Sequence, residues 1–89
     1  MKTNYNGTAT GAGSATVCSE NAGRLSFFFK SKGDVFVLNF GATATASNVL
    51  QINANESILL TRQAPYDITK QITVYCANSS GFQAQAEEV

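Results

Sequence analysis

The sequence predicts an all-β fold, a small antiparallel β-sandwich or jelly-roll-like barrel. Four stretches rich in alternating, β-branched or aromatic residues carry this prediction: residues 25–30, 34–40, 57–62 and 71–77. Turn-type residues separate them, and strands recur roughly every 8 to 12 residues, a spacing typical of sandwiches and barrels. The 89 residues allow one domain of modest stability, because a short chain buries a smaller share of its surface.

The N-terminal segment differs in composition from the rest of the chain. Residues 1–13 are mostly Gly, Thr, Asn and Ala, which bury too little apolar surface to offset the entropy lost on ordering. We therefore expect a flexible N-terminal arm over residues 1–13 and a β-sandwich domain over residues 14–89. If the arm is ordered, we expect a neighbouring subunit to hold it, with Tyr5 as its anchor.

The strongest expected strand, residues 25–30, follows a short apolar strand at residues 15–19. Alternation places Leu25, Phe27 and Phe29 on one face of this strand, and the size of these side chains makes that face the core. The opposite face is mainly polar.

The segment Ser31-Lys32-Gly33 lies between two apolar runs and therefore predicts a β-hairpin. The strand that follows, residues 34–40, places Phe36, Leu38 and Phe40 on one face and further apolar residues on the other. A strand that is apolar on both faces is expected in the middle of a sheet.

The second half of the chain predicts a loop and two further hairpins. Residues 41–48 have no helical apolar stripe and are expected to connect the two sheet layers. Residues 49–52 and 58–60 form an expected hairpin, and Pro65 ends its second strand. The last strand, residues 82–88, alternates clearly and places Phe82, Ala84 and Ala86 inward.

The weak charge of the chain limits its partners. Charged residues make up 13 % of the sequence and give a formal net charge of +0, with no basic stripe that could neutralise phosphates, so we expect no nucleic-acid partner. The polar N-terminus lacks a signal-peptide core, and no stretch approaches the roughly 20 apolar residues that span a bilayer, so we expect no membrane association. We expect the protein to be made in a cytoplasm.

The two cysteines, Cys18 and Cys76, are too few for a metal framework in a chain without histidine. We interpret them as two small buried hydrophobic residues. A disulfide between them stays open as an alternative if the protein meets an oxidising environment.

The sequence offers little for catalysis. Acid-base chemistry needs two titratable groups with separated pKa values or a nucleophile beside a base, and the chain has no histidine. Asp34 and Asp67 are expected to make local turn contacts, with a binding loop as the alternative for Asp67. Glu87 and Glu88 are expected to form a solvated tail. We therefore expect no enzyme, no cofactor and no metal.

Aromatic residues on polar faces are the remaining candidates for a site. Phe28, Tyr66, Tyr75 and Phe82 are the aromatic residues for which partial exposure is considered. Of these, Phe28, Tyr66 and Tyr75, together with Tyr5 of the arm, are predicted as interface residues, because aromatic side chains are enriched in interface cores. Phe28 and Tyr75 are expected on outer faces, where they could pair. Structural packing is the alternative for each of them.

From residue 20 onward the chain shows an ordered series of short motifs. They are Asn21-Ala22-Gly23-Arg24, the strand Leu25 to Phe29, Gly33, Asn39-Phe40-Gly41, the Thr/Ala-rich loop from Thr43 to Ser47, Leu50-Gln51-Ile52, Asn55-Glu56, the strand from Ile58 to Leu60, and a last hairpin between Ile72 and Glu87. In this series the chain resembles small virion proteins of tailed bacteriophages. In one loop the chain has Ala54-Asn55 where such proteins often carry Pro-Gly.

The resemblance implies a non-enzymatic virion protein that decorates or stabilises a capsid, bound to the major capsid protein or another virion protein. It also implies a homo-oligomer, with a trimer favoured. The alternative is an adaptor of a head or tail fibre whose loops bind host glycans. A small, weakly charged domain buries little apolar surface in its own core, and assembly with other subunits increases the buried area.

Overall fold

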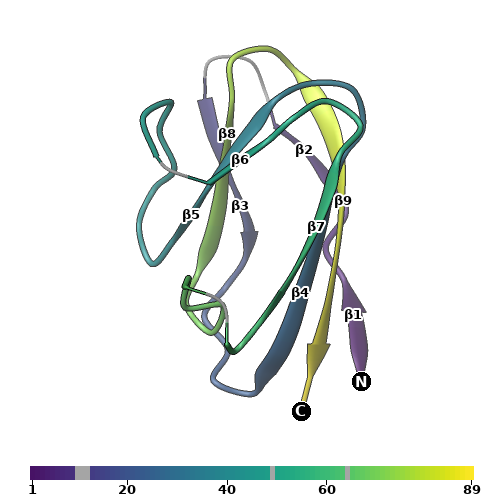
Figure 1. Cartoon of the computed structure of the whole chain (residues 1–89), viewed down its shortest axis with the longest axis vertical. Coiled ribbons are helices and arrows are strands. Elements are labelled where there is room, and N and C mark those ends of the chain that lie inside the picture. Colours follow the sequence, from purple (N-terminus) through teal and green to yellow (C-terminus); the bar gives the residue numbers. More distant parts are fainter. Residues whose placement is uncertain (10–12, 49, 64) are drawn as a thin grey trace.

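The computed structural model describes residues 1–9, 13–48, 50–63 and 65–89, which form nine strands and no helix (Figure 1). The strands build two antiparallel sheets that pack face to face as a β-sandwich, as predicted. Sheet A contains β1 (Lys2–Asn4), β2 (Gly7–Ala9), β4 (Arg24–Ser31), β7 (Ser57–Thr61) and β9 (Ser80–Glu88), and sheet B contains β3 (Gly13–Cys18), β5 (Phe36–Phe40), β6 (Leu50–Ile52) and β8 (Ile72–Cys76).

The strand order of sheet A is β1-β9-β4-β7, and β2 pairs with β9 beyond the end of β1. The order of sheet B is β3-β8-β5-β6. The strand β5 therefore has a neighbour on each side, which confirms the central position predicted for it. Both chain termini lie at the same end of the sandwich (Figure 1).

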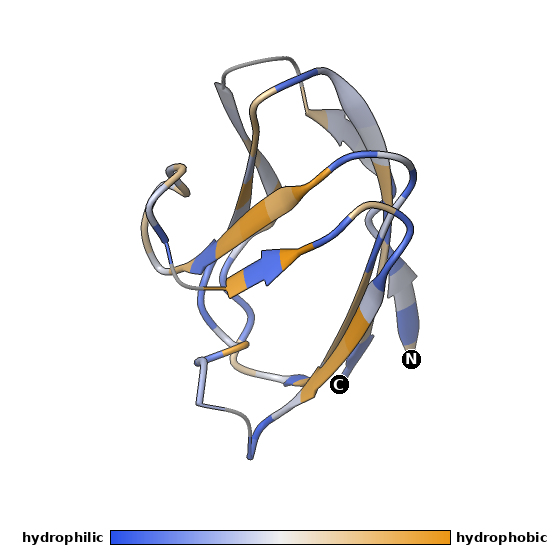
Figure 2. Cartoon of the chain, turned by 45° about the horizontal axis from the view of Figure 1, so that its top comes forward, coloured by the Kyte–Doolittle hydropathy of each residue, from blue (hydrophilic) through white to orange (hydrophobic). Residues whose placement is uncertain are grey.

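The core forms where the aromatic faces of the two sheets meet. The Phe29 ring of β4 lies 5.4 Å from the Phe36 ring of β5, edge to face, and 5.3 Å from the Phe82 ring of β9. All three rings are buried, as are Phe27 and Ala84. The alternation that predicted these inward positions is confirmed, and Figure 2 shows the apolar residues concentrated in the strands and the polar residues in most of the loops.

The three predicted hairpins are wrong. The connections from β4 to β5, from β6 to β7 and from β8 to β9 each cross from one sheet to the other. Conversely, the loop of residues 41–48, expected to join the layers, connects β5 to β6 within sheet B, where these strands pair. Loops of three or four residues, as here, reach across the roughly 10 Å between packed sheets as easily as the roughly 4.8 Å between paired strands, so turn residues alone do not distinguish the two.

The expected core position of Leu25 is also wrong. The pairing of β4 with β9 shifts between Arg24 and Ser26, a β-bulge in which one extra residue of β4 lacks a partner. The bulge reverses the alternation at this point, so that Arg24 is fully buried and Leu25 is 42 % exposed.

Much of the expected N-terminal arm belongs to the sandwich. The strands β1 and β2 pair with β9 of the same chain, and Ala9 is fully buried, so the expectation of an unpaired arm is wrong for these residues. Between the two strands, the Tyr5 amide donates to the Ala84 carbonyl at 2.8 Å, and the Asn6 side chain accepts from the Ala84 amide at 3.0 Å. Backbone groups of β9 that would otherwise be unpaired therefore bind the segment. Residues 10–12 of the expected arm lie outside the described residues.

Two neighbouring aromatic residues of β4 test the assignment of faces. The variant Phe29→Ala removes a ring from the centre of the core and is expected to cost about 3 to 5 kcal/mol of unfolding free energy. Phe28→Ala, on the outer face of the same strand, is expected to cost about 1 kcal/mol or less. Chemical denaturation measures both, and equal losses would contradict the assignment.

Candidate functional site

A buried arginine organises one end of the sandwich. The Arg24 side chain is fully buried at the start of β4, and its Nε donates to Oε2 of Glu88 at 3.0 Å. Its Nη1 donates to the carbonyls of Ile68 at 2.8 Å and Lys70 at 3.2 Å. Its Nη2 donates to the carbonyl of Ser19 at 2.8 Å. One side chain thus joins β4, the end of β9, the segment after β3 and the loop before β8.

Glu88 completes this network from the C-terminal strand. It is 7 % exposed, so the expectation that it belongs to a solvated tail is wrong. The Tyr5 hydroxyl donates to its carboxylate at 2.9 Å, and the N-terminal ammonium of Met1 donates to its carbonyl at 2.9 Å. Glu88 continues the inward alternation of Ala84 and Ala86 in β9, a signal that the sequence analysis did not follow to the end of the strand, and the bulge in β4 turns Arg24 inward to meet it. Glu87 is 40 % exposed at the side chain and lies 3.5 Å from the Met1 ammonium.

The pKa values in this network favour the ion pair. Burial alone raises the pKa of Glu88, but hydrogen bonds from Tyr5, Thr3 and Arg24 and the charge of Arg24 outweigh it, so the pKa lies below its usual value of 4.5. Burial, and then the neighbouring Glu88 carboxylate, raise the pKa of Tyr5 above its usual 10.0. Glu88 is therefore an anion and Tyr5 a neutral donor at neutral pH, an arrangement suited to holding segments together.

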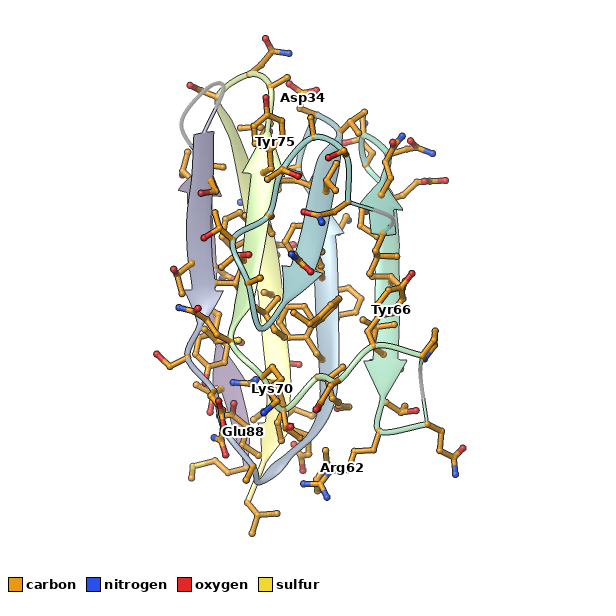
Figure 3. All side chains as sticks on the ribbon, turned by 90° about the vertical axis from the view of Figure 1, so that its left-hand side faces the viewer. Asp34, Arg62, Tyr66, Lys70, Tyr75 and Glu88 are labelled. Atoms are coloured by element: carbon orange, nitrogen blue, oxygen red, sulfur yellow. The ribbon has the colours of Figure 1, made fainter. Side chains whose placement is uncertain are left out.

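An open pocket of about 340 Å³ lies beside this network and is the candidate binding site. We call it the Tyr66 pocket. It is lined by Arg62, Pro65, Tyr66, Asp67, Ile68 and Thr69. Figure 3 shows Arg62 and Glu88 at one end of the molecule, with Lys70 and Tyr66 on the side towards the viewer and Tyr75 near the opposite end.

The loop that forms the Tyr66 pocket is held from beneath. Ile68 is buried, and its carbonyl accepts from Arg24, so the buried network positions the loop backbone. The Tyr66 ring stacks on Phe40 of β5 with centroids 5.2 Å apart, which leaves only its other face for a ligand. The Asp67 carboxylate accepts from the backbone amide of Thr69 at 3.0 Å and from its hydroxyl at 2.6 Å.

The charged groups of the Tyr66 pocket suit binding better than proton transfer. The hydrogen bonds from Thr69 hold the pKa of Asp67 below its usual 3.8, so this carboxylate is ionised at neutral pH and is a poor general base. The Arg62 guanidinium donates to the carbonyls of Arg24, at 2.8 Å, and Ala22. The pocket therefore offers one anion, one cation, a hydroxyl and an aromatic ring to a polar ligand.

The four predicted interface residues lie at separate places. Tyr5 is half-buried against the core, where its hydroxyl binds Glu88 of its own chain, and Tyr66 lines the pocket. Phe28 lies on the outer face of sheet A. Tyr75 is half-buried on the outer face of sheet B, between Ser14 of β3 and Val37 of β5. Its neighbours in β8, Val74 and Cys76, point inward and are buried. The expected pairing of Phe28 with Tyr75 is wrong, because the sandwich separates them.

The outer face of sheet A holds the predicted Phe28 beside an exposed leucine, Leu59, that the sequence analysis missed. Register places Phe28 of β4 between Leu59 of β7 and Gln85 of β9, and Asn4 of β1 continues the row. Leu59 is 63 % exposed and Leu25 is also exposed. A shallow hollow of about 190 Å³ lies beside Phe28, among asparagine and glutamine side chains. In the sequence, Leu59 lies two residues from each of the polar residues Ser57 and Thr61, and residues at this spacing share one face of a strand. This pattern indicated that Leu59 faces outward.

Both cysteines are buried and free, as preferred in the sequence analysis. Their strands pair, but Cys76 lies opposite Gly13 and Cys18 opposite Ile72, at the two ends of the ladder. This separation, roughly 15 Å at the rise of a β-strand, is too long for a disulfide. Burial raises the pKa of Cys18 from 9.0 to about 11, which makes its thiol unreactive at neutral pH.

Other classes of site find little support in the described part of the chain. It contains no cluster of three or more cysteine, aspartate or glutamate side chains placed to hold a metal. Nor does it contain a helix that is long and apolar enough to cross a membrane. No protein-family model, curated protein or solved structure matches this chain.

Acid denaturation tests the Arg24–Glu88 pair. Because the pKa of Glu88 is lower in the folded than in the unfolded protein, the unfolded chain binds more protons in acid, so this stabilisation is present above pH 4.5 and is lost as the pH falls through the folded pKa. Glu88→Gln is expected to cost about 3 kcal/mol at neutral pH, since it leaves Arg24 buried without its counter-charge. In this variant the unfolding free energy is also expected to fall less steeply than in the wild type as the pH decreases.

The control for this prediction is Glu56→Gln, which changes an exposed carboxylate. Unfolding free energies measured from neutral to acidic pH compare the two variants with the wild type. An unchanged acid profile in Glu88→Gln would contradict the role assigned to the pair.

Proposed function

We propose that this chain is a non-enzymatic structural protein of a bacteriophage virion, made in the host cytoplasm and bound to the capsid as a homo-oligomer. The observation that carries the proposal is the outer face of sheet A, where Phe28 and the exposed Leu59 are surrounded by amide and hydroxyl side chains, with Lys30 and Glu87 further along the same face. Such an apolar centre with a polar rim is typical of protein interfaces.

The resemblance to small virion proteins supports the same proposal. Arg24, the last residue of the matching Asn21-Ala22-Gly23-Arg24 segment, forms the buried network. The chain departs from the pattern at Ala54-Asn55, where such proteins often carry Pro-Gly, but Asn55 has φ 64°, in the left-handed region that glycine favours and asparagine tolerates. The resemblance favours the major capsid protein as the partner and a trimer as the oligomer.

The distribution of titratable groups favours a structural over an enzymatic role. Among the described residues, the buried ion pair of Arg24 and Glu88 is engaged in hydrogen bonds within the chain. The Asp67 carboxylate of the open pocket is kept ionised by Thr69. Neither arrangement supplies the acid and base of separated pKa values that hydrolytic chemistry uses.

Binding to undecorated capsids tests the proposal. The purified protein is expected to sediment with such capsids and to raise their melting temperature, because a ligand that binds the assembled state stabilises it. Phe28→Gln is expected to weaken this binding about tenfold, the loss of roughly 1.4 kcal/mol of contact. Val35→Gln, which changes another partly exposed apolar side chain, is the control. Absence of wild-type binding would overturn the proposal.

A second candidate function, a fibre adaptor that binds host glycans, is favoured by one observation, the Tyr66 pocket. An aromatic face beside an ionised carboxylate and a hydroxyl suits the apolar and hydroxyl-bearing surfaces of a sugar. Wild-type protein is then expected to bind a subset of a glycan array, and Tyr66→Ala and Asp67→Ala to lose that binding. Tyr75→Ala is the control, since Tyr75 lies far from this pocket (Figure 3). A blank array would contradict this function.

A further inference from the structure

The strand β7 is an open edge of sheet A. In the described part of the chain it pairs with β4 alone, and its register with β4 runs without a shift. The other edge strands are shorter or irregular: β1, β2 and β6 have three residues each, and the register of β3 with β8 shifts at its end. Short strands and bulges discourage pairing with other chains, and β7 has neither.

The backbone of β7 presents free groups to solvent in a regular order. The Ser31 amide donates to the Glu56 carbonyl at 3.0 Å, so these two residues form a hydrogen-bonded pair of the β4–β7 ladder. Hydrogen-bonded pairs alternate along an antiparallel ladder. The amides and carbonyls of Ser57, Leu59 and Thr61 are therefore directed away from β4, towards the open side.

The sequence of β7 is complementary to itself about Leu59. In an antiparallel pairing of two copies centred on this residue, Leu59 lies opposite Leu59 of the second copy, and Ser57 lies opposite Thr61. One step further, the positions of Glu56 and Arg62 lie opposite each other, so each end of the paired strands carries residues of opposite charge, although the Arg62 guanidinium itself donates to the Arg24 and Ala22 carbonyls of its own chain. Charge complementarity of this kind specifies register.

The same pairing covers the exposed leucine. Phe28 lies beside Leu59 on the outer face, so two joined copies place Phe28, Leu59 and their two counterparts in one row across a continuous sheet. Leu59, 63 % exposed in the single chain, would be flanked by apolar side chains on both sides. Figure 2 shows β7 as an apolar strand with paler ends.

We propose that β7 is a dimerisation edge, at which a second copy of this chain pairs antiparallel about a two-fold axis at Leu59. Three residue pairs would form about six backbone hydrogen bonds, two at each pair. The contact is isologous and therefore closes as a dimer. This inference names a copy-to-copy contact of the homo-oligomer proposed above, and it differs from the trimer that the resemblance implies.

Charge at the two-fold position tests the proposal directly. Leu59→Glu and Leu59→Lys each place like charges opposite each other and are expected to be monomers of 9.4 kDa, where the wild type has twice that mass. An equimolar mixture of the two is expected to regain the dimer, because each lysine then faces a glutamate. Sedimentation and light scattering measure the masses, and circular dichroism checks that both variants fold.

Leu25→Lys is the matched control, since it changes another exposed leucine of sheet A that is not on the edge, and it is expected to remain dimeric. As a second measurement, Leu59→Cys is expected to form a disulfide-linked dimer, because hydrogen-bonded pairs hold their Cα atoms about 5.5 Å apart. A wild type that is monomeric up to about 1 mM, or that is a trimer unaffected by Leu59→Glu, would overturn the proposal. Because no capsid is used, these outcomes are independent of capsid binding.

Discussion

The buried ion pair of Arg24 and Glu88 is the interaction on which the rest of this small protein depends. Removing two charges from water is costly, and the cost is offset only where every donor finds a partner. Arg24 meets this condition with one carboxylate and three backbone carbonyls, and Glu88 with Arg24 and Tyr5. Both chain ends and the pocket loop are joined at this point, so loss of one partner loosens all of them together.

The sequence predicted the strands and most of their inward faces, because alternation of side chains is a local property of a strand. It could not predict which strands pair. A short loop connects the strands of Phe29 and Phe36. A loop of this length can join two paired strands of one sheet or two strands in different sheets. Face-to-face packing brings the two rings within 5.4 Å of each other, and this contact depends on the whole fold rather than on the turn residues between them.

The candidate site could likewise be predicted only in part. Tyr66 and Asp67 were recognisable because Pro65 interrupts the strand pattern, but Arg62 and Thr69 join them only through the folded loop. The bulge at Leu25 was not predictable, since it is defined by pairing with β9, a strand more than 50 residues away in sequence. That single unpaired residue decides that an arginine enters the interior and a leucine faces solvent.

The proposed surfaces are neighbours that share single residues: Arg62 belongs to the Tyr66 pocket and follows the β7 edge, and Leu59 belongs to that edge and to the outer face of sheet A. The Tyr66 pocket lies beside the buried network, whereas the β7 edge and the outer face of sheet A lie on the sheet itself. Pairing of two copies through β7 leaves that outer face accessible and doubles its length. Two linked contacts with a repeating capsid surface bind more tightly than one, since the second contact forms within a complex already held by the first. Under the two proposals, a face with few charges and few apolar residues would owe much of its affinity for a capsid to the joining of two copies.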